Sequence, residues 1–219
     1  MLKRKLIIII VFFVSVFSIK YVYSLDISDN LIGKIIYVDP GHGGADPGAI
    51  YKNIEESDIN LTVSKKLKEN LEKLGATVYI TRDGNYDLSS TTVNRKKSDL
   101  YNRIKIINKS NCDVYISIHI NAETSNLWYG AQTFYYPANK KNIILAGYIQ
   151  KSLNENTNSK REVSRIDDTL MYTNIKVPGV LIELGFITNY QDRKKLNDEK
   201  YQNILVTSIS KGLIKYFNS

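Results

Sequence analysis

The sequence predicts a single α/β domain in which a mostly parallel, twisted sheet of about six strands carries helices on both faces. Short apolar runs alternate along the chain with longer amphipathic segments, a pattern typical of helices packed over a parallel sheet. The chain has 219 residues, 43% hydrophobic and 24% charged, which suits one domain with a short extra segment. It contains one cysteine, so we expect no internal disulfide.

The N-terminus has the pattern of an export signal. Basic residues at positions 3–5 precede an apolar stretch, residues 6–19. A helix of that length spans about 21 Å, which is shorter than a hydrocarbon core of about 30 Å. We therefore expect residues 1–24 to be a signal peptide cleaved after Ser24, with an uncleaved N-terminal anchor as the alternative. Residues 25–219 then act outside the cytoplasm, and the membrane is contacted only through an uncleaved N-terminal segment.

The hydrophobic pattern predicts the elements in order. Apolar runs bounded by turn residues predict strands, and apolar residues spaced by three and four predict helices. The clearest helix places Ile59, Val63 and Leu67 on one face and ends before Gly75. We expect strands at residues 34–39, 76–81, 114–118, 133–136, 170–172 and 180–184, and helices at residues 56–74, 99–109, 143–153 and 202–217.

The net charge of the chain is +8, but it is lower when the expected export signal is excluded. Four basic residues and no acids lie in the first 24 positions, so the rest carries 8 − 4 = +4. Its basic residues are scattered among acids and form no arginine-rich stripe. We expect no nucleic-acid partner; this charge suits work beside an anionic polymer such as a cell wall.

Both histidines of the chain stand where predicted strands end. In open α/β sheets, ligands bind beyond the carboxyl ends of strands. His42 follows the first strand in a glycine-rich turn, and His119 follows the third. Glu56 opens the first helix, and Glu183 ends an apolar strand, where an unpaired carboxylate is costly to bury. Two histidines and one carboxylate match the ligand set of a catalytic zinc, and a second carboxylate can act as general base. Hydrogen-bonded structural histidines are the alternative.

Five short segments carry these residues in a distinctive order. They are 38–44 VDPGHGG, 46–49 DPGA, 56–61 ESDINL, 117–122 SIHINA and 180–186 VLIELGF. Together they resemble the zinc-dependent N-acetylmuramoyl-L-alanine amidases of bacterial cell walls, of the amidase-3 type. The resemblance covers nearly all of residues 34–217, and it implies a zinc-exopeptidase-like fold.

The resemblance also implies residue roles. His42, Glu56 and His119 are the expected ligands of one Zn²⁺ per chain, and Glu183 is the expected catalytic carboxylate. The family's ligand glutamate normally stands alone, whereas Glu55 precedes Glu56 in this chain. The register of the segment that follows selects Glu56, with Glu55 as the alternative.

Three further residues are candidate contributors. Arg103 matches a family position and lies four residues after Asp99 on a predicted helix, which favours a structural salt bridge. Asn121, in the same segment as His119, is a candidate substrate-binding residue. Trp128, on a short loop, is another.

The implied activity is hydrolysis of the amide bond between N-acetylmuramic acid and L-alanine in peptidoglycan. The export signal, the catalytic domain and the segment 130–136 GAQTFYY look like the germination-specific branch. That branch removes stem peptides from spore cortex so that muramic lactam can form, which places the enzyme in the cell envelope, including the space between the forespore membranes. Only seven residues separate Ala122 from Gly130, too few for the helical plug that blocks the zinc in some relatives.

Other outcomes remain open from the sequence. An accessory or activator protein is conceivable, since some relatives rely on one, but no residue identifies it. A zinc peptidase that acts on wall peptides is one alternative function, and a catalytically silent wall-binding protein is another.

Overall fold

The computed structural model describes residues 30–167 and 169–219. The expected signal peptide at residues 1–24 lies outside these residues. Within the described part of the chain, no helix combines the length and the apolar character needed to cross a membrane.

A six-stranded sheet in the order β4-β1-β5-β8-β6-β7 forms the centre of the fold. Strands β4, β1, β5 and β8 are mutually parallel, β6 runs antiparallel to β8, and β7 pairs in parallel with β6. The predicted single α/β domain with a mostly parallel sheet is confirmed. The strands of the sheet are β1 (Ile35–Pro40), β4 (Thr77–Ile80), β5 (Val114–Asn121), β6 (Gln132–Tyr135), β7 (Ser164–Arg165) and β8 (Gly179–Phe186).

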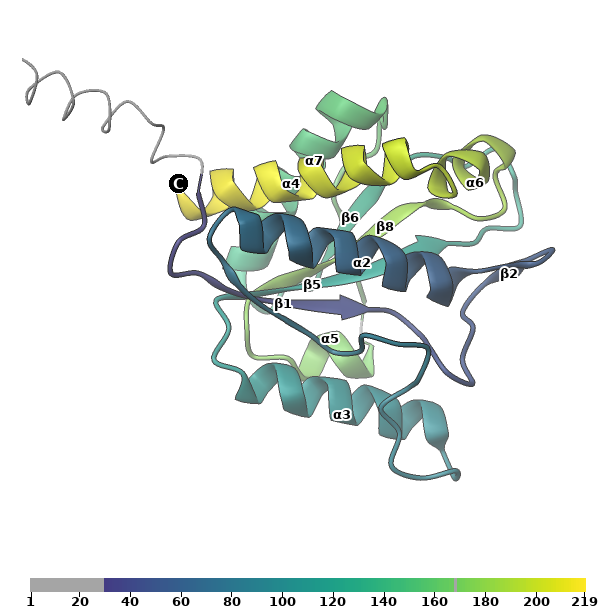
Figure 1. Ribbon diagram of the computed structural model, residues 1–219, viewed down its shortest axis with the longest axis horizontal. Coiled ribbons are helices and arrows are strands. Elements are labelled where there is room, and N and C mark those ends of the chain that lie inside the picture. The colour runs from purple at the N-terminus through teal and green to yellow at the C-terminus, as the bar shows by residue number, and fades with distance from the viewer. Residues whose placement is uncertain (1–29, 168) are drawn as a thin grey trace, which may run out of the picture. The chain divides into compact units, whose positions relative to one another are not determined.

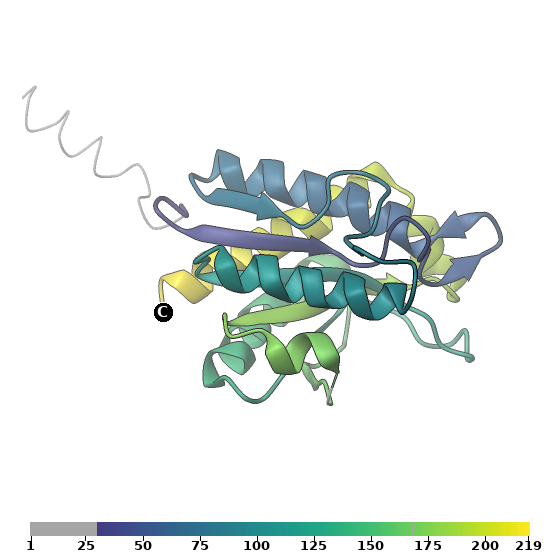
Figure 2. The same cartoon turned by 90° about the horizontal axis from the view of Figure 1, so that it is seen from below.

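Helices cover both faces of this sheet (Figures 1 and 2). One face carries α2, α4 and α7, which share the larger hydrophobic core with the central strands. The other face carries α3 and α5, which pack with a second, smaller cluster. The helices are α2 (Glu56–Lys73), α3 (Arg95–Lys109), α4 (Lys140–Thr157), α5 (Leu170–Asn174), α6 (Tyr190–Leu196) and α7 (Glu199–Phe217).

The central strand β5 shows why both faces need helices. Val114, Ile116 and Ile118 are buried in the larger core, whereas Tyr115 between them is buried in the smaller cluster. Successive side chains of a strand point to opposite faces, so a strand with buried apolar side chains on both sides must be covered twice. The continuous apolar run that predicted this strand therefore also explains its central place.

Residues 170–172 were predicted to form a strand, and this prediction is wrong. They begin the short helix α5 (Leu170–Asn174). Three consecutive apolar residues cannot distinguish a strand from a turn of buried helix, and here Met171 and Tyr172 are buried against the smaller cluster. The sixth strand is instead β7, a pair of residues with little apolar signal.

Two other elements carry no strong sequence pattern. A two-stranded antiparallel hairpin, β2 (Ile50–Tyr51) and β3 (Ile54–Glu55), precedes α2 directly. The helix α6 follows β8 and is capped by Asn189, whose side chain accepts hydrogen bonds from the N–H groups of Gln191 and Asp192.

Two predicted elements are longer than expected: helix α3 begins earlier, at Arg95, and strand β5 extends to Asn121.

Candidate metal centre

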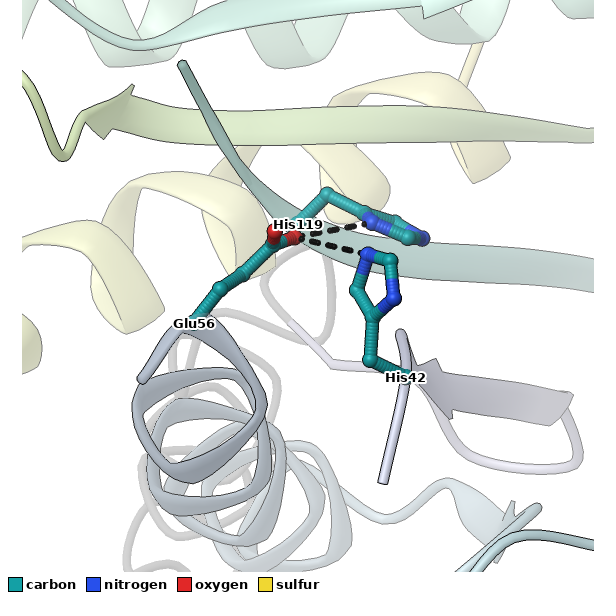
Figure 3. A group of neighbouring side chains, drawn as sticks. All are labelled: His42, Glu56 and His119. Atoms are coloured by element: carbon teal, nitrogen blue, oxygen red, sulfur yellow. Dashed lines mark hydrogen bonds and ion pairs between the residues drawn. The ribbon is translucent and has the colours of Figure 1, made fainter. Parts of the chain in front are cut away.

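Three segments far apart in sequence bring His42, Glu56 and His119 together at one end of the sheet. His42 lies in the loop after β1, and His119 lies near the end of the neighbouring, parallel strand β5. Glu56 is the first residue of α2, which the β2–β3 hairpin delivers to the same end. Figure 3 shows both imidazole rings directed at the carboxylate of Glu56.

The three side chains converge on a common centre. His42 Nε2 lies 3.2 Å from Glu56 Oε1, and His119 Nδ1 lies 3.1 Å from the same oxygen. The two rings meet edge to face, with centroids 5.0 Å apart. One ligand atom from each residue lies within 4.8 Å of the others. Two imidazole nitrogens and a carboxylate oxygen in this arrangement form a site that can hold a metal ion.

The loop that carries His42 is held in an unusual backbone conformation. His42 itself has a φ of 61°, a left-handed conformation that ordinary residues seldom adopt. Gly48, with a φ of +68°, passes so close that an added Cβ would lie 2.6 Å from Glu56 Oε2 and 2.8 Å from His42 Cδ2. Only glycine therefore fits at this point of the loop.

A neighbouring carboxylate orients the ring of His42. Its Nδ1 lies 3.0 Å from Asp46 Oδ2, so Asp46 holds one ring nitrogen while Nε2 faces Glu56. A carboxylate on the second ring nitrogen is the usual support of a metal-binding histidine. Burial alone would lower the pKa of His42, but the hydrogen bonds to Glu56 and Asp46 raise it.

The carboxylate of Glu56 is surrounded by donors. It accepts hydrogen bonds from the backbone N–H groups of Ala49 (2.9 Å) and Ile120 (3.0 Å) and from Asn60 Nδ2 (3.2 Å). Burial opposes its charge, yet the hydrogen bonds of the two imidazoles hold its pKa far below the usual range. Glu56 is therefore ionised at neutral pH. Glu55 lies in the hairpin opposite Ile50 and takes no part in this group.

Glu183 lies on β8, directly opposite His119 on β5. One of its carboxyl oxygens, Oε2, is buried and has no hydrogen-bond partner among the described residues. Burial, and after it the charge of Glu56, raises the pKa of Glu183 well above its usual value. A buried carboxyl group with one unpartnered oxygen and a raised pKa, on the strand beside a candidate metal ligand, has the character of a general acid and base.

Arg103 ties the candidate centre to the helix α3. Its guanidinium forms ion pairs with Asp39 (2.7 Å) and Asp99 (2.8 Å), and it donates to the carbonyl oxygens of Pro40 and His42, both at 2.7 Å. Arg103 therefore forms buried salt bridges, and its hydrogen bonds to the two carbonyl oxygens also hold the His42 loop in place.

Arg82 was missed by the sequence analysis. It is 1% exposed and donates to the carbonyl oxygens of Pro40 (3.1 Å), Gly41 (2.8 Å), Ser57 (2.8 Å) and Gly84 (3.1 Å). Burial and a neighbouring guanidinium lower its pKa to about 10. Arg82 thereby joins the loop of one histidine to the first turn of α2. Its position just after the carboxyl end of β4 was the available signal.

The two candidate substrate-binding residues lie at the same end of the sheet. Asn121 ends β5, is half-buried, and accepts the N–H of Ile187 at its carbonyl, 2.9 Å away. Trp128 lies on the loop between β5 and β6 and is 51% exposed. A cleft of about 150 Å³ opens at the metal centre and is lined by both histidines, Lys96 and residues of α5.

Comparison with known proteins gives a consistent picture. Residues 36–215 match the model of the N-acetylmuramoyl-L-alanine amidase family. The germination-specific N-acetylmuramoyl-L-alanine amidase of Bacillus subtilis is 40% identical over 216 residues, 94% of this chain and 91% of that protein. The probable cell wall amidase LytH of Staphylococcus aureus is 34% identical, over 86% of this chain and 60% of its own length.

Solved structures show the same likeness. The CwlD amidase of Clostridioides difficile, solved in complex with the GerS lipoprotein, superposes with a TM-score of 0.81 at 38% identity, covering 84% of this chain and 98% of that one. An N-acetylmuramoyl-L-alanine amidase from Clostridium difficile 630 superposes with a TM-score of 0.77 at 30% identity, covering 85% and 97%.

Proposed function

Because this chain belongs to the N-acetylmuramoyl-L-alanine amidase family, we propose that it is a zinc-dependent hydrolase of the amide bond between N-acetylmuramic acid and L-alanine in peptidoglycan. The observation that carries the proposal is the meeting of His42, Glu56 and His119 around one centre. Glu183 on the adjacent strand, with its buried and unpartnered Oε2, would supply the second requirement of the reaction.

The donor set fits zinc. Ligand atoms about 2.0–2.1 Å from a tetrahedral Zn²⁺ stand roughly 3.3 Å from one another. The nitrogens of His42 and His119 lie 3.2 and 3.1 Å from the Glu56 oxygen, and Asp46 supports the first ring in the usual manner. We propose that these three residues hold one Zn²⁺ per chain, which leaves a fourth position for water.

Glu183 would move the protons of the reaction. His42, Glu56 and His119 would hold a zinc ion whose chemistry is to lower the pKa of water to about 7 and to polarise a carbonyl. Glu183 accepts the proton of the attacking water and then donates it to the departing amine of L-alanine. Its raised pKa suits a group that must hold a proton between these two steps. Asn121 and Trp128, at the same end of the sheet, are the proposed substrate contacts.

We further propose that the chain removes stem peptides from spore cortex, which allows muramic lactam to form. The similarity to a germination-specific amidase over 94% of this chain supports this role. The neighbour bound to a lipoprotein supports an accessory partner, and cell-wall relatives support export through a signal peptide at residues 1–24. Spores that lack the protein should contain cortex without muramic lactam, measured by muropeptide analysis; wild-type lactam content would contradict the cortex role.

The chemistry is tested with purified protein and peptidoglycan. We expect the wild-type chain to release intact stem peptides with a free L-alanine amine, identified by mass spectrometry, and to stop when a chelator is added. Glu183→Gln should keep its zinc, measured by elemental analysis, and lose hydrolysis, whereas His119→Ala should lose the zinc. Glu69→Gln, an exposed change on α2, is the matched control.

Three results would contradict the proposal. Shortened peptides that keep their link to muramic acid would indicate a zinc peptidase. Binding to wall without any metal-dependent product would indicate a silent wall-binding protein. Full hydrolysis by Glu183→Gln would remove the role assigned to that residue.

A further inference from the structure

The loop between β5 and β6 exposes an apolar group at the end of the sheet that carries the metal centre. Leu127, Trp128 and Tyr129 are 80%, 51% and 52% exposed. The loop is nevertheless well anchored, because Asn189 Nδ2 donates to the carbonyl of residue 126 at 2.8 Å and the N–H of residue 130 donates to an Asp192 oxygen at 2.7 Å. An ordered loop gains little stability from the exposed parts of three large side chains, so these side chains suit a binding surface.

Arg161 is already oriented beneath this loop. Its guanidinium stacks on the ring of Trp128 at 4.7 Å and on the ring of Phe186 at 4.8 Å. Its Nε donates to the carbonyl of Tyr129 at 3.0 Å. Within the part of the chain that the structure describes, its two terminal nitrogens have no hydrogen-bond acceptor. The guanidinium is therefore fixed in place by stacking while its best donors stay free for a ligand.

A hollow of about 220 Å³ lies against these side chains, lined by Leu127, Trp128, Tyr129, Lys160 and Arg161. We call it the Trp128–Arg161 pocket. Two of the five lining residues are cations, and none is an acid. Lys160 forms no ion pair among the described residues. The charge of the pocket therefore favours an anionic group, and the terminal nitrogens of an arginine match the two oxygens of a carboxylate.

The pocket lies within reach of the reaction centre. Phe186, which stacks on Arg161, is three residues beyond Glu183 on β8, a separation of about 10 Å along an extended strand. Phe186 also lies opposite Asn121, the residue that ends the strand of His119. A substrate held at the metal centre needs only a short extension to reach the pocket.

We propose that the Trp128–Arg161 pocket is a subsite for a free carboxylate of the stem peptide, bound by Arg161 and Lys160 with the adjoining part of the ligand against Trp128. This inference rests on the proposed function, because it takes its ligand from the same substrate. It adds a specificity: the chain should prefer stem peptides with a free carboxylate over peptides in which the same group is a carboxamide.

Trp128 makes the test direct, because it is the one tryptophan of the chain and lies in the proposed subsite. Glu183→Gln, used to prevent turnover, is loaded with zinc and titrated with a disaccharide–peptide whose stem carboxylate is free, and then with its carboxamide form, while tryptophan fluorescence is followed. We expect the free acid to bind about tenfold more tightly, as is reasonable for one charge-assisted bidentate contact.

Substitutions in the pocket separate charge from folding. Adding Arg161→Gln should weaken binding of the free acid about tenfold. It should abolish the preference for the free acid over the carboxamide, because the neutral carboxamide forms no ion pair with Arg161. Lys160→Gln, which disturbs no anchor of the loop, should reduce the preference in the same direction. Lys211→Gln, a distant exposed change on α7, is the control for net charge and should keep the full preference. In the active chain, Arg161→Gln should act on KM more than on kcat.

The outcomes distinguish this inference from the proposed function. Equal affinity for the two ligands, or an unchanged preference in both Arg161→Gln and Lys160→Gln, would overturn the subsite even if the chain hydrolyses peptidoglycan. If the preference is lost on substitution but the wild-type chain does not hydrolyse peptidoglycan, the subsite is supported and the proposed enzyme activity is refuted.

Discussion

Replacing Gly41 by alanine tests the geometry of the candidate metal centre with one methyl group. Gly41 passes beside the ring of His119, and an added Cβ would lie 2.2 Å from Cε1, 2.4 Å from Nε2 and 2.6 Å from Nδ1 of that ring. The φ of Gly41 is not in the left-handed region, so alanine is tolerated by the backbone. The effect of Gly41→Ala therefore falls on the imidazole.

The size of the displacement follows from contact distances. Carbon atoms pack at about 3.5–4.0 Å, so the ring must withdraw by roughly 1.3 Å from its present place. Metal–ligand distances tolerate changes of about 0.2 Å. We expect the zinc dissociation constant of Gly41→Ala to rise about 100-fold, the upper range for disturbance of a ligand's surroundings. That rise corresponds to about 2.7 kcal/mol.

The assay is competition for zinc against a chromophoric chelator, with urea unfolding of the metal-free protein alongside. The ring of His119 is 18% exposed and can swing into the cleft, so we expect the metal-free protein to lose only about 1 kcal/mol, the low end for overpacking. Gly147→Ala is the matched control, because a Cβ there meets nothing within 4 Å. It should leave zinc affinity unchanged and stabilise α4 by about 0.5–1 kcal/mol. Wild-type zinc affinity in Gly41→Ala would refute the ligand role of His119.

Two further predictions concern the buried polar groups around the centre. In Arg82→Lys, the lysine cannot reach all four carbonyl oxygens that Arg82 binds. Zinc affinity should therefore fall about tenfold and the free energy of unfolding by about 1–3 kcal/mol. Unchanged zinc affinity in the chelator assay would show that Arg82 does not position the ligands. The second concerns acid: burial alone would raise the pKa of Asp39, but the Arg103 guanidinium lowers it below its usual value. A depressed folded-state pKa stabilises the fold above the unfolded value of about 3.9, and this stabilisation is lost as pH falls through the folded value. Urea unfolding followed from pH 5 down to roughly pH 2 should show a decline that is shallower in Asp39→Asn; parallel slopes would contradict the assignment.

Much of the candidate centre was predictable because parallel strands align their carboxyl ends. The apolar runs that end at Pro40 and near His119 predicted β1 and β5, and adjacent parallel strands bring their following residues to the same edge. The predicted family is confirmed by the match over residues 36–215. The choice of Glu56 over Glu55 came from the register of the following segment against the family pattern, and the structure has Glu56 as the first residue of α2.

Errors arose where local pattern is ambiguous. A run of three apolar residues at Leu170 is compatible with a strand or a buried helix, and packing against α3 decides for the helix. The direction of β6 depends on its pairing with β8, which strand periodicity does not encode.

The sequence by itself determined most of the alternation of strands and helices, which follows from periods of two and 3.6 residues within short windows. It also determined the edge of the sheet where the histidines stand, because parallel strands align their carboxyl ends. The tertiary structure alone decided the partners of the buried polar groups. Arg82 donates hydrogen bonds to the segments that carry His42 and Glu56. Arg161 stacks on Trp128, 33 residues away in the chain. A buried or stacked guanidinium takes whichever acceptors and rings the completed fold presents to it, and no local pattern specifies those.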